Sequence, residues 1–316
     1  MTALLGKKIL LSGGSGFLGK HVIDLLISKG VDSKDIIVPR SKDYDLRVWE
    51  NCKKATKDVD IVIHLAAKVG GIGFNQTHPG EAFYDNILIG SQLMEASRLS
   101  GVGKFVALGS VCAYPKLINP PFRESDLWNG YPEETNASYG LAKKMLIVQA
   151  QAYRKQYDFN AICLLPTNMY GPGDNFDPNS SHVIPALIKK VYDSKARGEK
   201  TLSVWGSGTA TRDFLYVEDA AEAVVSAAES YNGEDPVNIG SGSEISITDL
   251  VKLMCKLMDF DGDIRFERDK PDGQPRRCVD VTKAKQEFGF LAKTPIEEGL
   301  KNTIEWYENS LNAIKH

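Results

Sequence analysis

The sequence predicts an α/β fold, in which a Rossmann-type doubly wound parallel sheet is followed by a smaller C-terminal α/β domain. Three observations support this prediction. A glycine-rich turn near the N-terminus separates a short apolar run from an amphipathic segment. Apolar runs and helical periodicity then alternate to about residue 165, which is typical of a parallel sheet with crossover helices. After Pro166 the alternation breaks into loops, short strands and helices.

The N-terminal strand, turn and helix form the first unit. A strand is expected over Lys8–Ser12, and the helix that follows should end at Gly30. Between them, Gly13 permits a tight turn, Gly16 lets the backbone approach a pyrophosphate, and Gly19 lets the helix pack on the strand. The helix N-terminus faces the anion, so the turn predicts a dinucleotide site rather than a merely structural loop. The expected contacts are Gly13, Ser15, Gly16, Phe17, Leu18 and Gly19.

The residues after the second strand, which is expected over 35–39, distinguish between the two nicotinamide dinucleotides. An NAD-binding unit usually places an acidic residue there to hold the ribose 2′-hydroxyl. This chain has Arg40, Ser41 and Lys42 instead. Two cations suit the additional 2′-phosphate, so Arg40 and Lys42 are predicted to bind NADP(H). The alternative is a solvated basic loop.

The third and fourth strands should deliver further residues to the same edge of the sheet. The third is expected over 59–65, and small residues at its end would let the backbone approach the adenosine half of a cofactor. His64 stands within this apolar run and is interpreted as a core histidine. A helix over 81–100 leads to the fourth strand, Lys104–Leu108. The expected cofactor contacts after the third strand are Leu65, Ala66 and Ala67.

A serine, a tyrosine and a lysine form the predicted reaction centre. Ser110 follows the fourth strand, at the edge where open parallel sheets bind ligands. Tyr139 and Lys143 are four residues apart on a predicted helix and therefore share one face. The lysine ammonium should favour the phenolate of the tyrosine near neutral pH. Such a tyrosine suits proton transfer to a carbonyl oxygen during hydride transfer from the cofactor.

Cys112 and His182 are candidates for a second reaction at the same site. In an extended segment, alternation would turn Cys112 and Ser110 toward the same side. A cysteine near a held carbonyl could remove a proton from the adjacent carbon, and the groups that bind the ketone would stabilise the enolate. His182, in a polar loop before a helix expected over 184–194, could supply a proton on the other face. For Cys112 the alternative is a buried small hydrophobe.

Six segments resemble the GDP-L-fucose synthase family of extended short-chain dehydrogenases/reductases. They are LAAKVGGIGFNQTHP (65–79), FYDNILIG (83–90), LGSVCAYP (108–115), PTNMYGPGDNFDPNSSHVIPALI (166–188), VWGSGTATRDFLYVEDAA (204–221) and KPDGQPRR (270–277). The resemblance implies NADPH-dependent 3,5-epimerisation and 4-keto reduction of GDP-4-keto-6-deoxy-D-mannose to GDP-L-fucose. It assigns the reduction to Ser110, Tyr139 and Lys143. It assigns the epimerisation to Cys112 as base and His182 as acid.

The resemblance also implies further contacts with both ligands. The cofactor contacts include Tyr139, Lys143, Pro166, Asn168, Met169 and His182. The contacts with the GDP-sugar substrate are Asn168, Lys190, Trp205, Arg212 and a basic residue of the pair Arg276 and Arg277, with Arg276 as the first choice. The chain departs from the family pattern at Ser15 and Lys190, where arginines are common. Some use of NADH, and a related substrate such as a GDP-4-keto-6-deoxy-heptose, are therefore the alternatives.

The alternation of strands and helices also predicts how the chain is divided. Residues 1–165 should form the NADP-binding Rossmann domain, and residues 166–316 mainly the substrate-binding domain. The resemblance suggests that residues 217–240 return to the first domain. In the second domain, Thr294, with a proline after it and Glu297 three positions on, predicts a capping box that opens a helix.

Composition and helix pattern limit the partners and the compartment. The 316 residues carry a formal net charge of -3, which gives no support for binding to nucleic acid. No apolar run approaches the ~18 residues of a membrane helix, so no membrane contact is expected. Five cysteines without a CxxC pair favour reduced thiols in the cytoplasm and no metal site. The apolar helices expected over 81–100 and 139–157 could pair with a second subunit, so a homodimer is expected.

Overall fold

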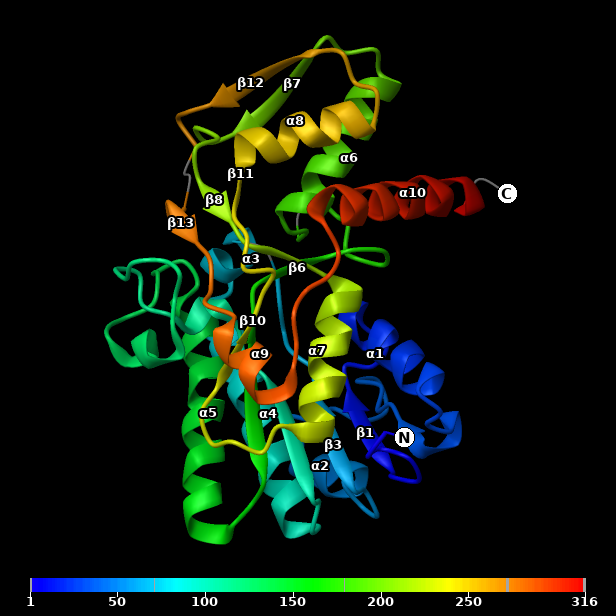
Figure 1. Ribbon diagram of the computed structural model, residues 1–316, viewed down its shortest axis with the longest axis vertical. Coiled ribbons are helices and arrows are strands. Elements are labelled where there is room, and N and C mark those ends of the chain that lie inside the picture. Colours follow the sequence, from blue (N-terminus) through cyan, green and yellow to red (C-terminus); the bar gives the residue numbers. More distant parts are fainter. Residues whose placement is uncertain (1, 71, 179, 271–272, 315–316) are drawn as a thin grey trace.

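A six-stranded parallel sheet lies at the centre of the computed structural model, which describes residues 2–70, 72–178, 180–270 and 273–314 (Figure 1). The strand order is β10-β5-β4-β3-β1-β2, and all neighbouring strands run parallel. Their carboxyl ends therefore share one edge, where open α/β sheets bind ligands. The strands are β1 (Ile9–Ser12), β2 (Ile36–Ile37), β3 (Ile61–His64), β4 (Lys104–Leu108), β5 (Ala161–Pro166) and β10 (Val237–Ile239).

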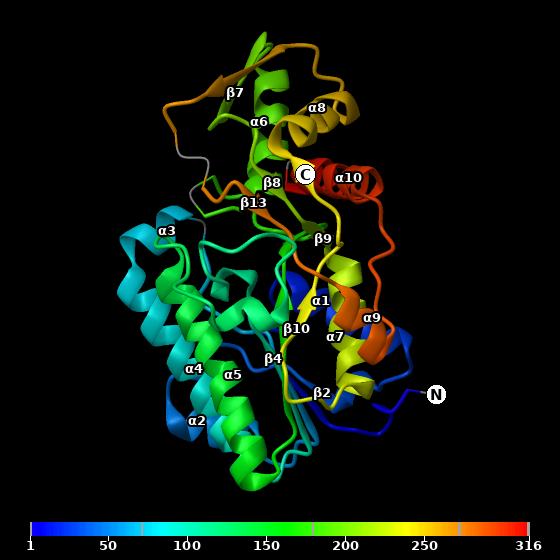
Figure 2. The same cartoon turned by 60° about the vertical axis from the view of Figure 1, so that its left-hand side comes forward.

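Alternating side chains along the strands build two separate cores. Leu11 and Ile63 belong to the core on one face, and their neighbours Leu10 and Val62 belong to the core on the other. Helices cover both faces, as a doubly wound sheet requires (Figures 1 and 2). The first face carries α1 (Phe17–Ser28), α7 (Val217–Ser230) and α9 (Thr282–Phe288), and the second carries α2 (Trp49–Ala55), α4 (Pro79–Leu99) and α5 (Ala137–Tyr157).

A second group of elements lies beyond the carboxyl edge of the large sheet, at the top of Figure 1. It has its own apolar core, which includes Ile188, Leu202, Leu250 and Leu300. Its helices are α6 (Val183–Ala196), α8 (Ile247–Leu257) and α10 (Ile296–Ile314). Its strand groups are β7 (Thr201–Trp205) with β12 (Asp263–Glu267), β6 (Asn168–Tyr170) with β9 (Phe214–Tyr216), and β8 (Thr211–Arg212) between β11 (Ile245–Ser246) and β13 (Arg276–Arg277).

The chain passes repeatedly between these two groups. After β9 it enters α7, which packs against α1. It then adds β10 to the large sheet beside β5, with Val237 opposite Leu164. Residues far apart in the sequence are therefore needed to complete the large sheet.

Several local features differ from the sequence-based expectations. Several short elements were not predicted. They are the helices α2, α3 (Ile72–Thr77) and α9 and the 3₁₀ turns η1 (Ser33–Asp35), η2 (Val111–Ala113) and η3 (Glu124–Trp128). The predicted capping box is wrong, because the Thr294 N–H donates to the Asp219 carboxylate at 3.0 Å. Glu297 instead pairs with Lys256 at 3.6 Å. None of the helices in the described part of the chain has both the length and the apolar character needed to cross a membrane.

Candidate active site

The glycine turn opens the site at the carboxyl end of β1. Gly13 has a φ of +77°, in the left-handed region that glycine adopts readily. A Cβ on Gly19 would lie 2.2 Å from the carbonyl oxygen of Gly13, so only glycine allows α1 to pack so closely on the turn. No side chain caps α1 at Gly16, and the turn lines a large cavity. The first N–H groups of α1 are thus available to an anion such as a pyrophosphate.

The cavity has a volume of about 1660 Å³ and extends from this turn to the upper strands. Pockets for a single small molecule usually have about 300–1,000 Å³, so there is room for a dinucleotide and a second ligand. Arg40 and Arg276 are the predicted site residues that do not line it. Those that do are Gly13, Ser15, Gly16, Phe17, Leu18, Gly19, Lys42, Leu65, Ala66, Ala67, Ser110, Cys112, Tyr139, Lys143, Pro166, Asn168, Met169, His182, Lys190, Trp205 and Arg212.

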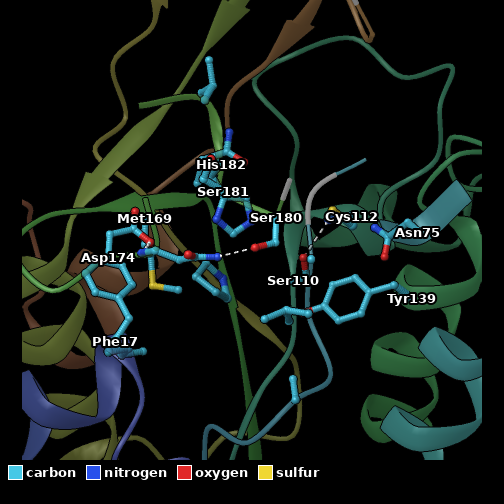
Figure 3. Close-up of a pocket in the computed structure, with 18 of the residues that line it drawn as sticks. Phe17, Asn75, Ser110, Cys112, Tyr139, Met169, Asp174, Ser180, Ser181 and His182 are labelled. Carbon is cyan, nitrogen blue, oxygen red and sulfur yellow. Dashed lines mark hydrogen bonds between the residues drawn. The ribbon is translucent and has the colours of Figure 1, made fainter. Parts of the chain in front are cut away.

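Ser110 and Cys112 reach the cavity through a 3₁₀ turn (Figure 3). The Ser110 hydroxyl caps η2 by accepting the N–H of Cys112 at 3.1 Å. The expected alternation along an extended segment is therefore wrong, and the turn brings both side chains to the site. The turn lies tightly against α5, because a Cβ on Gly140 would be 2.2 Å from the carbonyl oxygen of Cys112.

Tyr139 and Lys143 lie one turn apart near the start of α5. Lys143 is 2% exposed, and its Nζ donates to the carbonyl oxygen of Leu108 at 2.9 Å. This bond ties α5 to the end of β4, directly before Ser110. Ser110, Cys112 and Tyr139 thus gather on the wall formed by β4, η2 and α5 (Figure 3).

The opposite wall comes from the upper group of elements. His182 is the N-cap residue of α6, and its side chain makes no capping hydrogen bond. Its imidazole faces the cavity instead (Figure 3). Lys190, two turns further along α6, donates to the carbonyl oxygen of Ser203 at 2.7 Å. Trp205 ends β7, lines the cavity and is 66% exposed, and Lys270 Nζ lies over its ring at 5.9 Å from the centroid.

Of the two adjacent arginines in β13, Arg277 lines the cavity and Arg276 does not. Arg276 lies outside the cavity lining and forms a two-bond ion pair with Glu244, at 2.6 and 3.1 Å. Side chains alternate along a strand, so in β13 Arg277 faces the opposite way and lines the cavity. The predicted 2′-phosphate contact Arg40 is likewise outside the cavity lining, which includes Ser41 and Lys42.

Comparisons with known proteins agree with this geometry. The NAD dependent epimerase/dehydratase family matches residues 9–240. The chain belongs to this family. It is 43% identical to the GDP-L-fucose synthase of Sinorhizobium fredii over 98% of each chain. It is 32% identical to the GDP-L-colitose synthase of Yersinia pseudotuberculosis, over 96% of this chain and 99% of that one.

A solved structure supports the same assignment to the epimerase/dehydratase family. A GDP-L-fucose synthetase from Naegleria fowleri bound to NADP matches with a TM-score of 0.89 and 29% identity. The match covers 99% of this chain and 96% of that chain. Sequence and structure together place the chain among the GDP-L-fucose synthases of the epimerase/dehydratase family.

Burial sets the protonation of the tyrosine and lysine in this epimerase/dehydratase site. Burial and the nearby Cys112 raise the pKa of Tyr139, and Ser110 opposes them only in part. The expectation of a favoured phenolate is therefore wrong, since the resting tyrosine is a neutral phenol that can donate a proton. Burial also lowers the pKa of Lys143 to about 8, which keeps most of the amine protonated at neutral pH.

Two further groups have shifted protonation for the same reason. The imidazole of His182 faces the cavity, but the protein atoms around it desolvate the charged form and lower its pKa. Proton donation from His182 should therefore increase as the pH falls. Burial raises the pKa of the Asp174 carboxyl to about 7, although the backbone N–H of Asn175 opposes this shift.

Sequence reasoning missed several polar residues of the site. Asp174 and Ser181 line the cavity, and each has a buried oxygen without a hydrogen-bond partner in the described chain. Asn75 also lines it and donates to Asn136 at 2.9 Å. All of these except Asn136 lie within segments quoted above for the family resemblance, but nothing in the pattern marked them as buried. Gln274 and Arg277 were missed as neighbours of Cys112 because they follow it by more than 160 positions.

Proposed function

We propose that this chain converts GDP-4-keto-6-deoxy-D-mannose to GDP-L-fucose by 3,5-epimerisation and NADPH-dependent reduction of the 4-keto group. One observation carries the proposal. A single cavity brings together the Ser110 hydroxyl, the Tyr139 phenol, the Cys112 thiol and the His182 imidazole. Reduction alone would need only the first two, with Lys143. The relatives that span nearly the whole chain bear the name of this activity.

The residues present fit NADP(H). The uncapped start of α1 and the glycine turn suit the pyrophosphate, and Lys42 suits the 2′-phosphate. The backbone at Ala66 and Ala67 would border the adenosine half. When bound, NADPH supplies the hydride for the ketone.

In the reduction, the residues of this chain hold the carbonyl and move one proton. Tyr139 donates its phenolic proton to the C4 oxygen as that oxygen becomes negative, and Ser110 donates a hydrogen bond to the same oxygen. Lys143 places a positive charge one helical turn away and so favours the transient phenolate. Tyr139 then regains its proton from solvent.

In the epimerisation, two residues act on opposite faces of the sugar. The Cys112 thiolate takes the proton from C3 or C5, each next to the ketone, and becomes a thiol. The C4 oxygen carries the enolate charge, and Ser110 and Tyr139 stabilise it. Imidazolium His182 gives a proton to the other face of the carbon and becomes neutral. Cys112 then loses its proton to solvent and His182 gains one, so the enzyme returns to its starting state.

A second candidate substrate is a related GDP-4-keto-deoxy sugar. Lys190 lines the cavity at a position where an arginine is common in the family. Unlike an arginine, a lysine cannot form two parallel hydrogen bonds to a diphosphate. The similarity to a GDP-L-colitose synthase supports the same alternative. Turnover of a GDP-4-keto-6-deoxy-heptose would test this alternative substrate class as well.

We also propose a homodimer in the cytoplasm, with residues 1–165 and 217–240 as the cofactor domain and most of 166–316 as the substrate domain. Helices α4 and α5 lie side by side at the surface (Figure 2). They carry exposed apolar side chains, which a second subunit could cover. All five cysteines are free thiols, in keeping with a reducing compartment.

The deciding experiment follows NADPH oxidation at 340 nm with GDP-4-keto-6-deoxy-D-mannose in deuterated water, with NMR and mass analysis of the product. Deuterium at C3 and C5 together with NADPH consumption is the expected result. Tyr139→Phe should abolish reduction and slow exchange without abolishing it, because Ser110 still donates a hydrogen bond to the enolate oxygen. Cys112→Ser should abolish exchange at both carbons. NADPH consumption without deuterium in the product would show that the enzyme is a simple ketoreductase. If the protein binds NADPH but does not turn over this substrate, the same experiment is repeated with the GDP-sugar precursors of colitose and of the heptose.

A further inference from the structure

Arg277 contacts the thiol that the epimerisation requires. Its Nη1 lies 3.8 Å from Cys112 Sγ and donates toward it. The two residues come from β13 and η2, lie 165 positions apart in the sequence, and both line the cavity. A guanidinium stays protonated at every pH of interest, so it is a permanent positive charge beside the sulfur.

Gln274 holds the guanidinium in this position. Its side-chain oxygen accepts both Nε of Arg277, at 3.1 Å, and Nη2, at 3.0 Å. The amide of Gln274 is in turn fixed by a bond of 2.9 Å to the carbonyl oxygen of Lys116, and the residue is buried. Two of the three guanidinium nitrogens are thus engaged by the protein, and the third is left facing Cys112. The cation is oriented without the help of a substrate.

We propose that Arg277, oriented by Gln274, keeps Cys112 as a thiolate and so sets the pH above which the epimerisation base works. The proposal deepens the proposed function, because it concerns the base of that reaction. Arg277 is a positioning residue, since it acts on the substrate through the sulfur. A thiolate, rather than a thiol, is the form that accepts a proton from carbon, and an adjacent cation favours it.

Other charged groups near the thiol do not reproduce this effect. Tyr139 also faces Cys112, but it is a neutral phenol because its pKa is raised. Lys143 lies one turn further along α5, and its Nζ bonds to Leu108 instead. Since the pKa of Lys143 is about 8, its titration overlaps the range of the measurement. Every variant below keeps Lys143 and Tyr139, so differences between variants report on Arg277.

The test measures how fast iodoacetamide alkylates Cys112 between pH 5 and pH 10 in the full-length protein without substrate. The thiolate displaces iodide and forms a sulfur–carbon bond, so the rate follows the thiolate fraction. Peptide mass analysis assigns the product, Cys112→Ser gives the background, and the other four cysteines are buried. The variants are Arg277→Gln, Arg277→Lys and Gln274→Ala. Arg276→Gln is the matched control, because it removes an adjacent arginine that is paired with Glu244.

Arg277→Gln should raise the midpoint of the alkylation profile by about one pH unit and slow alkylation at pH 6 roughly tenfold. Arg277→Lys should restore part of the shift, because the charge stays but the two-bond grip of Gln274 is lost. Gln274→Ala should move the midpoint in the same direction as Arg277→Gln, by less. Arg276→Gln should leave the profile unchanged. Thermal unfolding checks that each variant folds. If Arg277→Gln does not fold, the alkylation profile of Gln274→Ala decides the test.

An unchanged midpoint in folded Arg277→Gln, or an equal shift in Arg276→Gln, would overturn the proposal. In that case a loss of turnover in Arg277→Gln alone would point to substrate binding by this arginine. Because alkylation needs no substrate, its result is independent of the proposed function. A shifted midpoint in an enzyme that incorporates no deuterium would leave the Arg277–Cys112 pair intact and reject the epimerase.

Discussion

Asp174 is a buried acid at the edge of the ligand cavity. The carboxyl is 8% exposed, and one oxygen accepts the N–H of Asn175 at 2.7 Å. The other oxygen has no partner among the described residues. A buried carboxylate with one free oxygen is costly unless it is protonated or a ligand donates to it. The raised pKa of about 7 expresses that cost.

Asp174→Asn should therefore change how stability depends on pH. The acid has a pKa near 3.8 when unfolded and about 7 when folded, so the folded state binds the extra proton. The contribution of this carboxyl to the unfolding free energy is then greatest below pH 4 and falls as the pH rises toward 7, by up to about 4 kcal/mol. Asparagine has the shape of the protonated acid, so the variant should match the wild type at pH 4 and exceed it at pH 8.

Urea unfolding of the ligand-free protein at the two pH values measures this difference. The comparison at pH 4 is the control, because there the folded state holds a neutral side chain in both proteins. A stability difference of equal size at both pH values would show that the carboxyl is not the cause.

At the scale of elements, the site depends on how α5 meets η2. Gly140 faces the backbone of Cys112 so closely that even one added carbon would collide with the carbonyl oxygen. This contact fixes the 3₁₀ turn that presents Ser110 and Cys112, while Lys143 fixes the preceding strand end. The helix that carries the tyrosine and lysine thus also shapes the loop that carries the serine and cysteine.

Gly140→Ala should destabilise the protein by about 1–3 kcal/mol through overpacking and should slow both reactions, since η2 must move. Gly80→Ala is the matched control, because a Cβ at this helical position meets nothing within 4 Å. There alanine should stabilise the helix by about 0.5–1 kcal/mol. Urea unfolding and NADPH oxidation measure the two effects. Full stability and activity in the Gly140→Ala variant would disprove the tight contact.

A second element contact joins α7 to the start of α10. The Asp219 carboxylate accepts the Thr294 N–H just before that helix begins. Asp219 thus supplies, from another helix, the carboxylate acceptor that Glu297 was expected to supply within α10. The upper helix is thereby attached to a helix of the large sheet.

Asp219→Ala should lower the free energy of unfolding by about 1–3 kcal/mol, because a partly buried N–H loses a charged acceptor. Glu297→Ala removes only a surface pair with Lys256 and should change stability by less than about 1 kcal/mol. Thermal unfolding of both variants measures the contrast. An equal loss of stability in the two variants would show that Glu297 contributes as much as Asp219 and would contradict this prediction.

These contacts show what the sequence could and could not predict. β4 was predicted over its full span, and Ser110, Tyr139 and Lys143 were found, because strand patterns, glycine turns and helical spacing are local signals. His64 was also placed correctly, since it is buried and bonds Ser12 at 2.7 Å. The roles of Asp219 and Arg277 could not be predicted, because their partners lie 75 and 165 positions away. The neutral state of Tyr139 depends on burial, which spacing does not reveal.

At the scale of the whole molecule, α4 and α5 pack side by side (Figure 2), and each helix carries exposed apolar side chains on its outer surface. Tyr84 on α4 is 61% exposed, and Val148 on α5 is 43% exposed. Residues of this kind on two adjacent helices would form half of a four-helix interface with a second copy. The proposed dimer therefore places this surface at its centre.

Val148→Glu should convert the dimer to a monomer, because the interface would have to bury an unpaired carboxylate. Ile27→Glu on α1 is the control, since Ile27 is similarly exposed, at 44%, on a different face. Light scattering coupled to size exclusion measures the mass of each variant. A wild-type protein with the mass of one chain would reject the dimer itself.

β10 is the last strand of the large sheet to be translated, and this order affects folding during synthesis. β5 is an interior strand only because Val237–Ile239 pairs with its outer side. At about 5–20 residues per second, a ribosome needs roughly 4 to 15 s to add the chain between the ends of β5 and β10. During that interval the nascent sheet has an open apolar edge, of the kind that recruits other strands. Until the last strand emerges, this edge of the growing polypeptide is the place where pairing with a strand of another chain is expected.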